Sequence, residues 1–331
     1  MVSKSEPQRK TERRETRDDG RGTIREKTTW LHRFTQFVAL ATFVLIIAGG
    51  LVTSTGSGLS VPDWPLSYGK FFPPMIGGIR FEHTHRVIAG FVGLLTLILM
   101  VWLLRKEKRK TVRWMGIAAF MAVLAQSILG GISVIHLLPT AVSVIHACLA
   151  QTFFCLIATI AAVTSPEWEK EQPRRIIAFK PLHRLLIFTV AFIYLQLIAG
   201  SIVRHTAAKH GLYLHFAGAF LVLVHALLVF LKMSKAHGND KILARSSLFL
   251  GLLVLVQIFL GFGAFIFKVM IKKTVMPRSE EVFFATAHQA AGALILATSP
   301  HGTLVKEANP LPFVVAWNER FLVMRVIFSP A

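Results

Sequence analysis

The sequence predicts an all-α integral membrane protein with eight transmembrane helices, arranged as two tandem four-helix bundles. Apolar residues make up 53% of the 331 residues and charged residues only 16%, with a mean hydropathy of +0.57. Soluble domains of this size rarely have such a composition. Eight apolar stretches are long enough to cross a bilayer, and their sequence motifs recur between the two halves of the chain.

Residues 1–33 are polar and rich in Lys and Arg, and they lack the apolar centre of a signal peptide. We expect a disordered, basic cytoplasmic tail. Residues 34–163 then form the first four-helix unit, whose spans are expected at Phe34–Thr53, His83–Leu104, Trp114–Val134 and Thr140–Val163. The connection between the first two spans is dense in Gly, Pro and aromatic residues, which is typical of a folded lid or an interfacial patch.

Residues 164–181 are predicted to be a cytoplasmic linker, and residues 182–299 the second four-helix unit. Its spans are expected at Leu182–Val203, Leu212–Lys232, Ser246–Phe267 and Val282–Ser299. Residues 300–331 include Pro310, Pro312 and a second apolar patch, and form an atypical C-terminal tail.

The net charge of +20 indicates topology and not nucleic-acid binding, because Lys and Arg concentrate in the N-terminal tail and in alternate loops. By the positive-inside rule, both termini are cytoplasmic and the loop that carries Trp64 faces outward. The sequence thus predicts a multi-pass protein of the cell membrane.

An internal repeat relates the two halves. The end of the first span, around Gly49, recurs in the fifth span around Gly200, and the Gln-x-x-x-Gly motif of the third span recurs in the seventh. Since each unit has an even number of spans, the repeats run parallel and are related by a pseudo-twofold axis along the membrane normal.

The repeat places one histidine near the outer end of each even-numbered span: His85, His146, His215 and His288. Imidazoles from two helices of a bundle can ligate a haem iron axially. The matched positions predict two haem sites, one held by His85 and His146 and the other by His215 and His288. Single intramembrane histidines also serve as hydrogen-bonded interior groups or proton relays, and that interpretation remains the alternative.

Two arginines lie beside these histidines. Arg86 follows His85, and Arg204 ends the fifth span, so both could pair with haem propionates near the outer surface. Their alternative is interfacial snorkelling. Glu82 shares a helix face with His85, but the repeat has no counterpart for it, because the position three before His215 is Leu212.

The segment Glu82-x-x-His85-Arg86, the preceding loop Thr55-Gly56-Ser57-Gly58-Leu59-Ser60-Val61-Pro62-Asp63-Trp64-Pro65 and Arg204-His205-Thr206 resemble the haem A synthase family, from about Phe37 to Thr298. Many bacterial members carry a cysteine pair in the first outer loop. This chain has Ser67 near the second of those positions, and its two cysteines, Cys148 and Cys155, lie in the fourth span.

The resemblance implies an enzyme that oxidises the C8 methyl of haem O to a formyl group, giving haem A for terminal cytochrome oxidases. It implies that His85 and His146 flank the substrate haem, that His215 and His288 ligate a haem b cofactor, and that Glu82 is the catalytic carboxylate. The implied partners are the haem O synthase that supplies the substrate, cytochrome oxidase, and a quinone or other electron acceptor; self-association as a homo-oligomer is also open.

Two other functions fit the residues alone. One is a non-catalytic haem carrier or oxidase assembly factor, which would bind haem without changing it. The other is a bis-histidine electron-transfer protein linked to quinone. Identification of the bound porphyrin separates these alternatives.

Overall fold

The computed structural model describes residues 6–166, 180–206, 209–236, 241–271 and 276–298, and within these ranges the regular secondary structure is helical. This confirms the all-α prediction. The elements are α1 (Glu6–Ser54), α2 (Ile79–Lys106), α3 (Lys110–Ile135), α4 (Thr140–Val163), α6 (Lys180–His205), α7 (Lys209–Ala236), α8 (Lys241–Phe265), the π-helical turn η1 (Ile266–Met270) and α9 (Ser279–Thr298).

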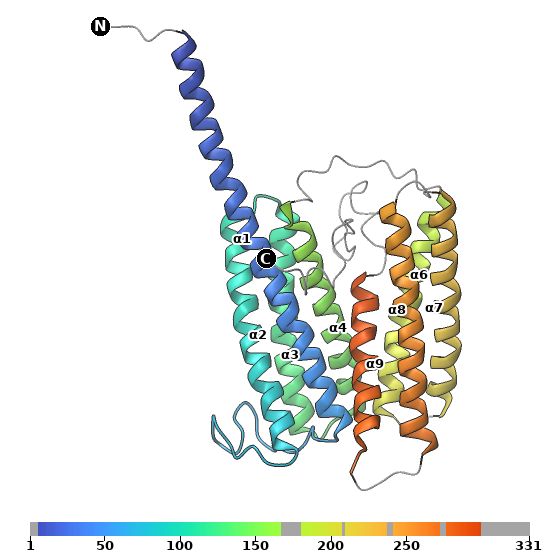
Figure 1. The fold of residues 1–331 in the computed structure, drawn as a ribbon. Coiled ribbons are helices and arrows are strands. Elements are labelled where there is room, and N and C mark those ends of the chain that lie inside the picture. Colours follow the sequence, from blue (N-terminus) through green and yellow to red (C-terminus); the bar gives the residue numbers. More distant parts are fainter. Residues whose placement is uncertain (1–5, 167–179, 207–208, 237–240, 272–275, 299–331) are drawn as a thin grey trace.

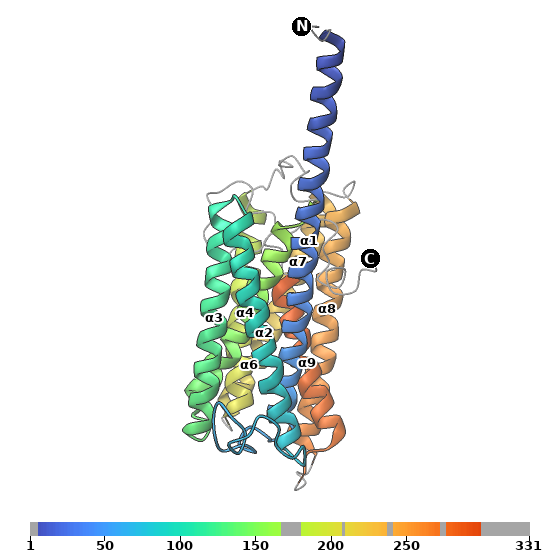
Figure 2. The same cartoon turned by 90° about the vertical axis from the view of Figure 1, so that its left-hand side faces the viewer.

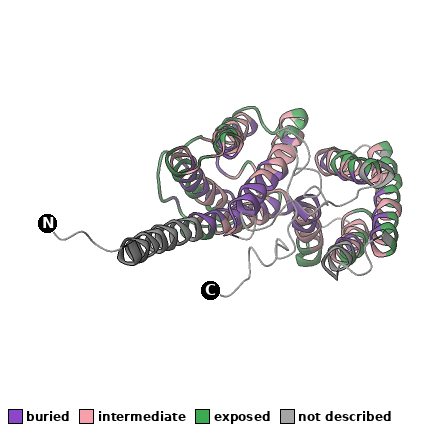
Figure 3. Ribbon diagram, turned by 90° about the horizontal axis from the view of Figure 1, so that it is seen from above, coloured by how far each residue is buried: buried purple, intermediate pink, exposed green. Residues whose placement is uncertain are grey.

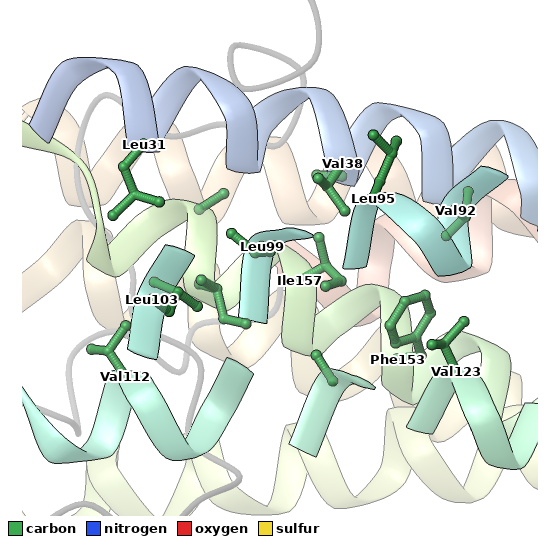
Figure 4. Packing of buried hydrophobic residues seen from close by; sticks show 14 of the residues in the cluster. Leu31, Val38, Val92, Leu95, Leu99, Leu103, Val112, Val123, Phe153 and Ile157 are labelled. Atoms are coloured by element: carbon green, nitrogen blue, oxygen red, sulfur yellow. The ribbon is translucent and has the colours of Figure 1, made fainter. Parts of the chain in front are cut away.

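The first four helices form one group, in which each packs against its neighbours in the chain and α1 closes the ring against α4 (Figure 1). Their facing sides bury a continuous aliphatic core with residues from all four helices, including Leu31, Val38, Leu99, Val112 and Ile157 (Figure 4). Between helices in a bilayer, such close packing is the main source of stability, because lipid tails are as apolar as the side chains.

Helices α6 to α9 form the second group, and the two groups meet where α9 packs on α1 and α4, and α6 on α4. Figure 2 shows α1 and α9 side by side, and Figure 3 shows buried residues concentrated between helices and along this junction. A second apolar cluster crosses the junction, with Ile46 of α1 and Phe154 of α4 packed together with residues of α6 to α9.

Seven of the described helices are long and apolar enough to cross a membrane: α1 from Trp30, α2, α3, α4, α6, α7 and α8. The predicted eighth span, Val282–Ser299, corresponds to α9, which is not one of the seven. Its 20 residues include Glu280, Glu281, His288 and Gln289. The second half of α9 is largely buried against other helices, so it does not need the uniformly apolar surface of a lipid-exposed span.

Helix α1 begins at Glu6, whereas the sequence analysis expected a disordered tail up to residue 33. In Figures 1 and 2 its first part projects beyond the ends of the other helices. The segment is rich in Glu, Arg and Lys, which are good helix formers, and its one proline, Pro7, lies in the first turn, where helices tolerate it. Residues 300–331 and most of the predicted linker 164–181 lie outside the described residues.

Candidate haem sites and the outer loop

Each of the four predicted histidines lies against a glycine of the preceding helix. A Cβ built on the glycine would stand 3.1 Å from the Cε1 of His85 at Gly49, 3.7 Å from that of His146 at Gly130, 2.9 Å from that of His215 at Gly200 and 2.8 Å from that of His288 at Gly261. At three of these positions a real side chain would push the imidazole away. The glycines therefore form part of the site, a role that the sequence analysis did not assign to them.

In the second group, the structure brings His215 and His288 together. Their ring centroids are 6.0 Å apart and their planes are inclined by 80°. Two imidazoles that bind one iron from opposite faces of a haem, each through a metal–nitrogen bond of about 2 Å, place their centroids roughly 6 Å apart. The separation of this pair therefore fits two axial ligands of a single iron.

In the first group, His85 and His146 are close enough to interact electrostatically. Their Nδ1 atoms are buried and have no hydrogen-bond partner among the described residues. Buried ring nitrogens are normally hydrogen-bonded, so these two have lone pairs or protons available to a bound ligand. The donor type, the glycine cradles and the partial burial of both pairs are compatible with haem.

Three glutamines accompany the histidines, each four residues before the glycine. The amide nitrogen of Gln126 donates to the carbonyl of His146 at 2.9 Å, and that of Gln196 donates to the carbonyl of His215 at 2.7 Å. The third, Gln257, accepts on its backbone carbonyl a bond of 3.1 Å from Nδ1 of His288. A carbonyl that accepts from one ring nitrogen orients the other toward a metal. That other nitrogen of His288, Nε2, lies 3.4 Å from the side-chain amide nitrogen of Gln257, a contact that a bound iron would replace.

Helix α1 departs from this pattern, because Leu45 occupies the position of the glutamine. The first group has a carboxylate near its histidines, which the second group lacks at the matching position. It belongs to Glu82 on α2, which is only 4% exposed and lies one turn before His85. Its Oε2 accepts a hydrogen bond of 2.9 Å from the Val61 N–H, and its Oε1 lies 2.6 Å from Nη2 of Arg86. The sequence predicted that Glu82 shares a helix face with His85, but it did not suggest that this carboxylate binds the outer loop.

Arg86 anchors that loop, residues 55–78, to α2. Besides Glu82, its guanidinium donates to the carbonyls of Asp63 at 2.6 Å, Leu66 at 2.7 Å and Val61 at 3.2 Å. Both Nη atoms are thus occupied by protein groups. The predicted propionate role of Arg86 therefore has to compete with these bonds.

Further hydrogen bonds fold the loop on itself and onto α2. Ser67 Oγ lies 2.9 Å from Nδ1 of His83, and both residues are buried. The Asp63 carboxylate accepts from the backbone N–H groups of Gly69 at 2.7 Å and Tyr68 at 2.6 Å, and these bonds hold the pKa of Asp63 below its ordinary value. This outer loop is therefore ordered by specific polar contacts.

Arg204, at the end of α6, links the two groups of helices. Its Nη2 donates to the Gly50 carbonyl and to Ser54 Oγ, both at 2.9 Å, and its Nη1 donates to the Ala285 carbonyl at 3.1 Å. Its buried Nε has no partner, and no described carboxylate forms an ion pair with it. A buried cation without a counterion is costly, which makes this a favourable place for an anionic group.

Comparisons with known proteins agree with the resemblance. Residues 32–77 and 79–212 match the family COX15-CtaA, described as cytochrome oxidase assembly protein. The proteins similar to this chain include heme A synthases from an Exiguobacterium species (33% identical over 184 residues), Exiguobacterium sibiricum (31% over 184) and Shouchella clausii (26% over 183).

Each of the three matches covers 54% of this chain, and the matched part is 59%, 60% and 60% of the respective relative. The chain therefore spans about three fifths of the length of these curated relatives. The family match includes Glu82, His85, His146 and Arg204 and stops at residue 212, before His215 and His288. Since it covers more than half of the sequence, the chain belongs to the cytochrome oxidase assembly protein family.

Proposed function

We propose that the protein is a haem A synthase, an integral-membrane oxidoreductase that converts the C8 methyl of haem O to the formyl group of haem A. The observation that carries the proposal is the arrangement of three residues. The buried Glu82 lies one turn before His85 on α2, and His146 of α4 lies close to His85. All three residues are within the part that matches the family. The relatives named heme A synthase support the same activity.

In this proposal, the first group of helices binds the substrate haem between His85 and His146, and the second binds a haem b cofactor between His215 and His288. The support for the second site is the 6.0 Å separation of its rings. Haem b would supply electron-transfer chemistry there. The glycines and glutamines behind the imidazoles orient the ligand nitrogens.

Glu82 supplies the charged group next to the substrate. The Val61 N–H and Arg86 fix its carboxylate in a buried position, where a preorganised negative charge can stabilise positive charge that develops at the oxidised methyl carbon or assist removal of its proton. Of the two predicted propionate partners, Arg204 is the better placed, since its Nε is unpartnered, whereas the Nη atoms of Arg86 already bind Glu82 and the loop.

The proposed enzyme crosses the membrane eight times, with α9 as the last span and both termini in the cytoplasm, and its two four-helix units are related by a pseudo-twofold axis along the membrane normal. The four matched histidine–glycine contacts support this relationship. Haem O synthase, a quinone or other electron acceptor, and cytochrome oxidase are the proposed partners.

The decisive experiment is expression with a supply of haem O, followed by extraction and chromatography of the bound haems. We expect haem A from the wild-type protein and accumulated haem O from Glu82→Gln. Gln is the better substitution, because its carbonyl can still accept from Val61 while the charge is lost. A wild-type protein that binds haem O and returns it unchanged would instead indicate a carrier.

A Glu82→Gln protein that made haem A at the wild-type rate would remove the assigned role of the carboxylate. Ligation is tested separately by the optical spectrum. We expect His215→Ala and His288→Ala each to lose the low-spin haem b signal, while Cys148→Ser, a substitution on α4 at the junction, retains it.

A further inference from the structure

The outer loop covers the outer end of the first group of helices. It leaves α1 at Thr55 and is held on α2 by Glu82, His83 and Arg86. It also reaches the turn between α3 and α4, where a Cβ on Gly58 would stand 3.5 Å from the Leu138 side chain. Figure 1 shows the loop folded beside the ends of α2 and α3. The loop thus links α1 to α2 and contacts the turn between α3 and α4.

One side chain of the loop reaches into the bundle. A Cβ built on Gly131 of α3 would stand 2.9 Å from Cδ2 of Trp64 and 3.1 Å from its Cε2 and Cε3. The indole therefore lies directly against the α3 backbone, and only glycine leaves room for it. The residue as a whole is 40% exposed.

The residues that hold Trp64 are direct sequence neighbours of residues of the first site. The residue before Gly131 is Gly130, the glycine that faces His146. On the other flank, the residue after His85 is Arg86, whose Nη1 donates to the carbonyls of Asp63 and Leu66, one on each side of Trp64 in the chain. Arg86 therefore fixes the loop backbone on both sides of the tryptophan, and the ring lies against α3 beside the glycine that faces His146.

We propose that Trp64 is a positioning residue that closes the outer end of the site between His85 and His146, holding the substrate haem in place and excluding water from it. This inference rests on the proposed function only where it names the haem bound between His85 and His146 as haem O. Closure of this kind favours the reaction because a fixed geometry and a dry site both lower the barrier.

A double-mutant cycle tests the contact. Because Ala at position 131 would displace the indole, Gly131→Ala and Trp64→Ala should have the same effect, and combining them should add nothing. Trp64→Phe, which keeps an aromatic ring, should restore most of the wild-type behaviour. Gly93→Ala on α2 is the matched control, because a Cβ there meets nothing within 4 Å.

Two quantities are measured on the full-length, haem-loaded protein. The first is the rate at which haem dissociates and is captured by an excess of apomyoglobin. The kinetic phase that disappears in His146→Ala reports dissociation from the first site. We expect about a tenfold increase in Trp64→Ala and in Gly131→Ala, the effect of losing one aromatic contact. The second is conversion of haem O to haem A, where we expect kcat to fall by about tenfold to a hundredfold, more than KM changes.

The outcomes separate this inference from the proposed function. If the wild type makes no haem A but haem release follows the cycle, the synthase proposal fails and Trp64 keeps its role in closing the site. If the wild type makes haem A while Trp64→Ala keeps the wild-type release rate and kcat, the role of Trp64 is refuted. Additive effects of Gly131→Ala and Trp64→Ala would also refute it, since the glycine would then act through another group.

Discussion

Four glycines determine how closely the site histidines approach the neighbouring helices. At each position the imidazole packs against the backbone of the neighbouring helix, and the rings of His215 and His288 are also held by hydrogen bonds. The repeat in the sequence was sufficient to predict the four histidines. It could not predict which glycines oppose them, because that depends on the rotation of each helix about its axis, which packing determines.

The glycine at position 261 offers the sharpest test of this packing. In Gly261→Ala, the new Cβ would stand 2.8 Å from Cε1 and 3.1 Å from Nδ1 of His288. Such overpacking costs about 1–3 kcal/mol and moves the ring. We expect the low-spin haem signal of the second site to be weakened or lost in the optical spectrum.

Gly251→Ala is the control on the same helix, where a Cβ meets nothing within 4 Å. It should leave the spectrum unchanged and stabilise the helix slightly, since Ala has a higher helix propensity than Gly. Equal spectra for the two variants would contradict the cradle interpretation.

At the scale of secondary-structure elements, Arg86 attaches the outer loop to α2. The Gly, Pro and aromatic residues predicted a folded lid or an interfacial patch. They could not predict that the Glu82–Arg86 pair binds this loop, because such a pair is equally typical of an interfacial charge cluster. Only the tertiary structure brings Val61, Asp63 and Leu66 within reach of the guanidinium. The burial of α9 likewise could not be predicted from its amino-acid composition, because it results from packing against other helices.

We expect Arg86→Ala to release the loop. The side chain is 14% exposed and that of Glu82 is 5% exposed, and removal of one partner from a largely buried pair costs about 3 kcal/mol or more. Chymotrypsin should then cleave after the exposed Phe71 faster than in the wild type. Arg80→Ala removes an exposed arginine from the same helix, and its cleavage rate should stay at the wild-type value; equal rates for both variants would show that Arg86 does not hold the loop.

The proposed topology gives a prediction for the whole molecule. A membrane-impermeant thiol reagent added to intact cells should label Lys70→Cys in the outer loop and spare Lys108→Cys, which lies between α2 and α3. A Cys148→Ser background removes the only half-buried native thiol, and Cys155 is buried. The reverse labelling pattern would invert the orientation that the positive-inside rule predicts.

Arg204 connects the two groups of helices, and the sequence could not reveal this, because a repeat describes each unit and not how the units dock. One hydrogen bond reaches Gly50, the neighbour of Gly49, which contacts His85. Another reaches Ala285, one turn before His288, and the positive charge of Arg204 acts electrostatically on His288. In Arg204→Ala, three acceptors lose a donor, although Ser54 Oγ keeps its 3.0 Å contact with Thr286 Oγ1. The two carbonyls keep the hydrogen bonds of their own helices, so the loss is that of hydrogen bonds to a charged donor. Since such bonds contribute about 1.5–3 kcal/mol each, the melting temperature should fall.

The charge of Arg204 can be separated from its hydrogen bonds. A buried cation favours the reduced haem, which is the less positive form, so Arg204→Ala should lower the midpoint potential of the haem held by His215 and His288. Arg204→Lys keeps the charge but offers a different donor geometry, so its potential should stay near the wild-type value while its melting temperature falls. Redox titration and thermal melts of the three proteins measure both effects, and a wild-type potential in Arg204→Ala would mean that Arg204 joins the two units mechanically, without electrostatic influence on the second haem.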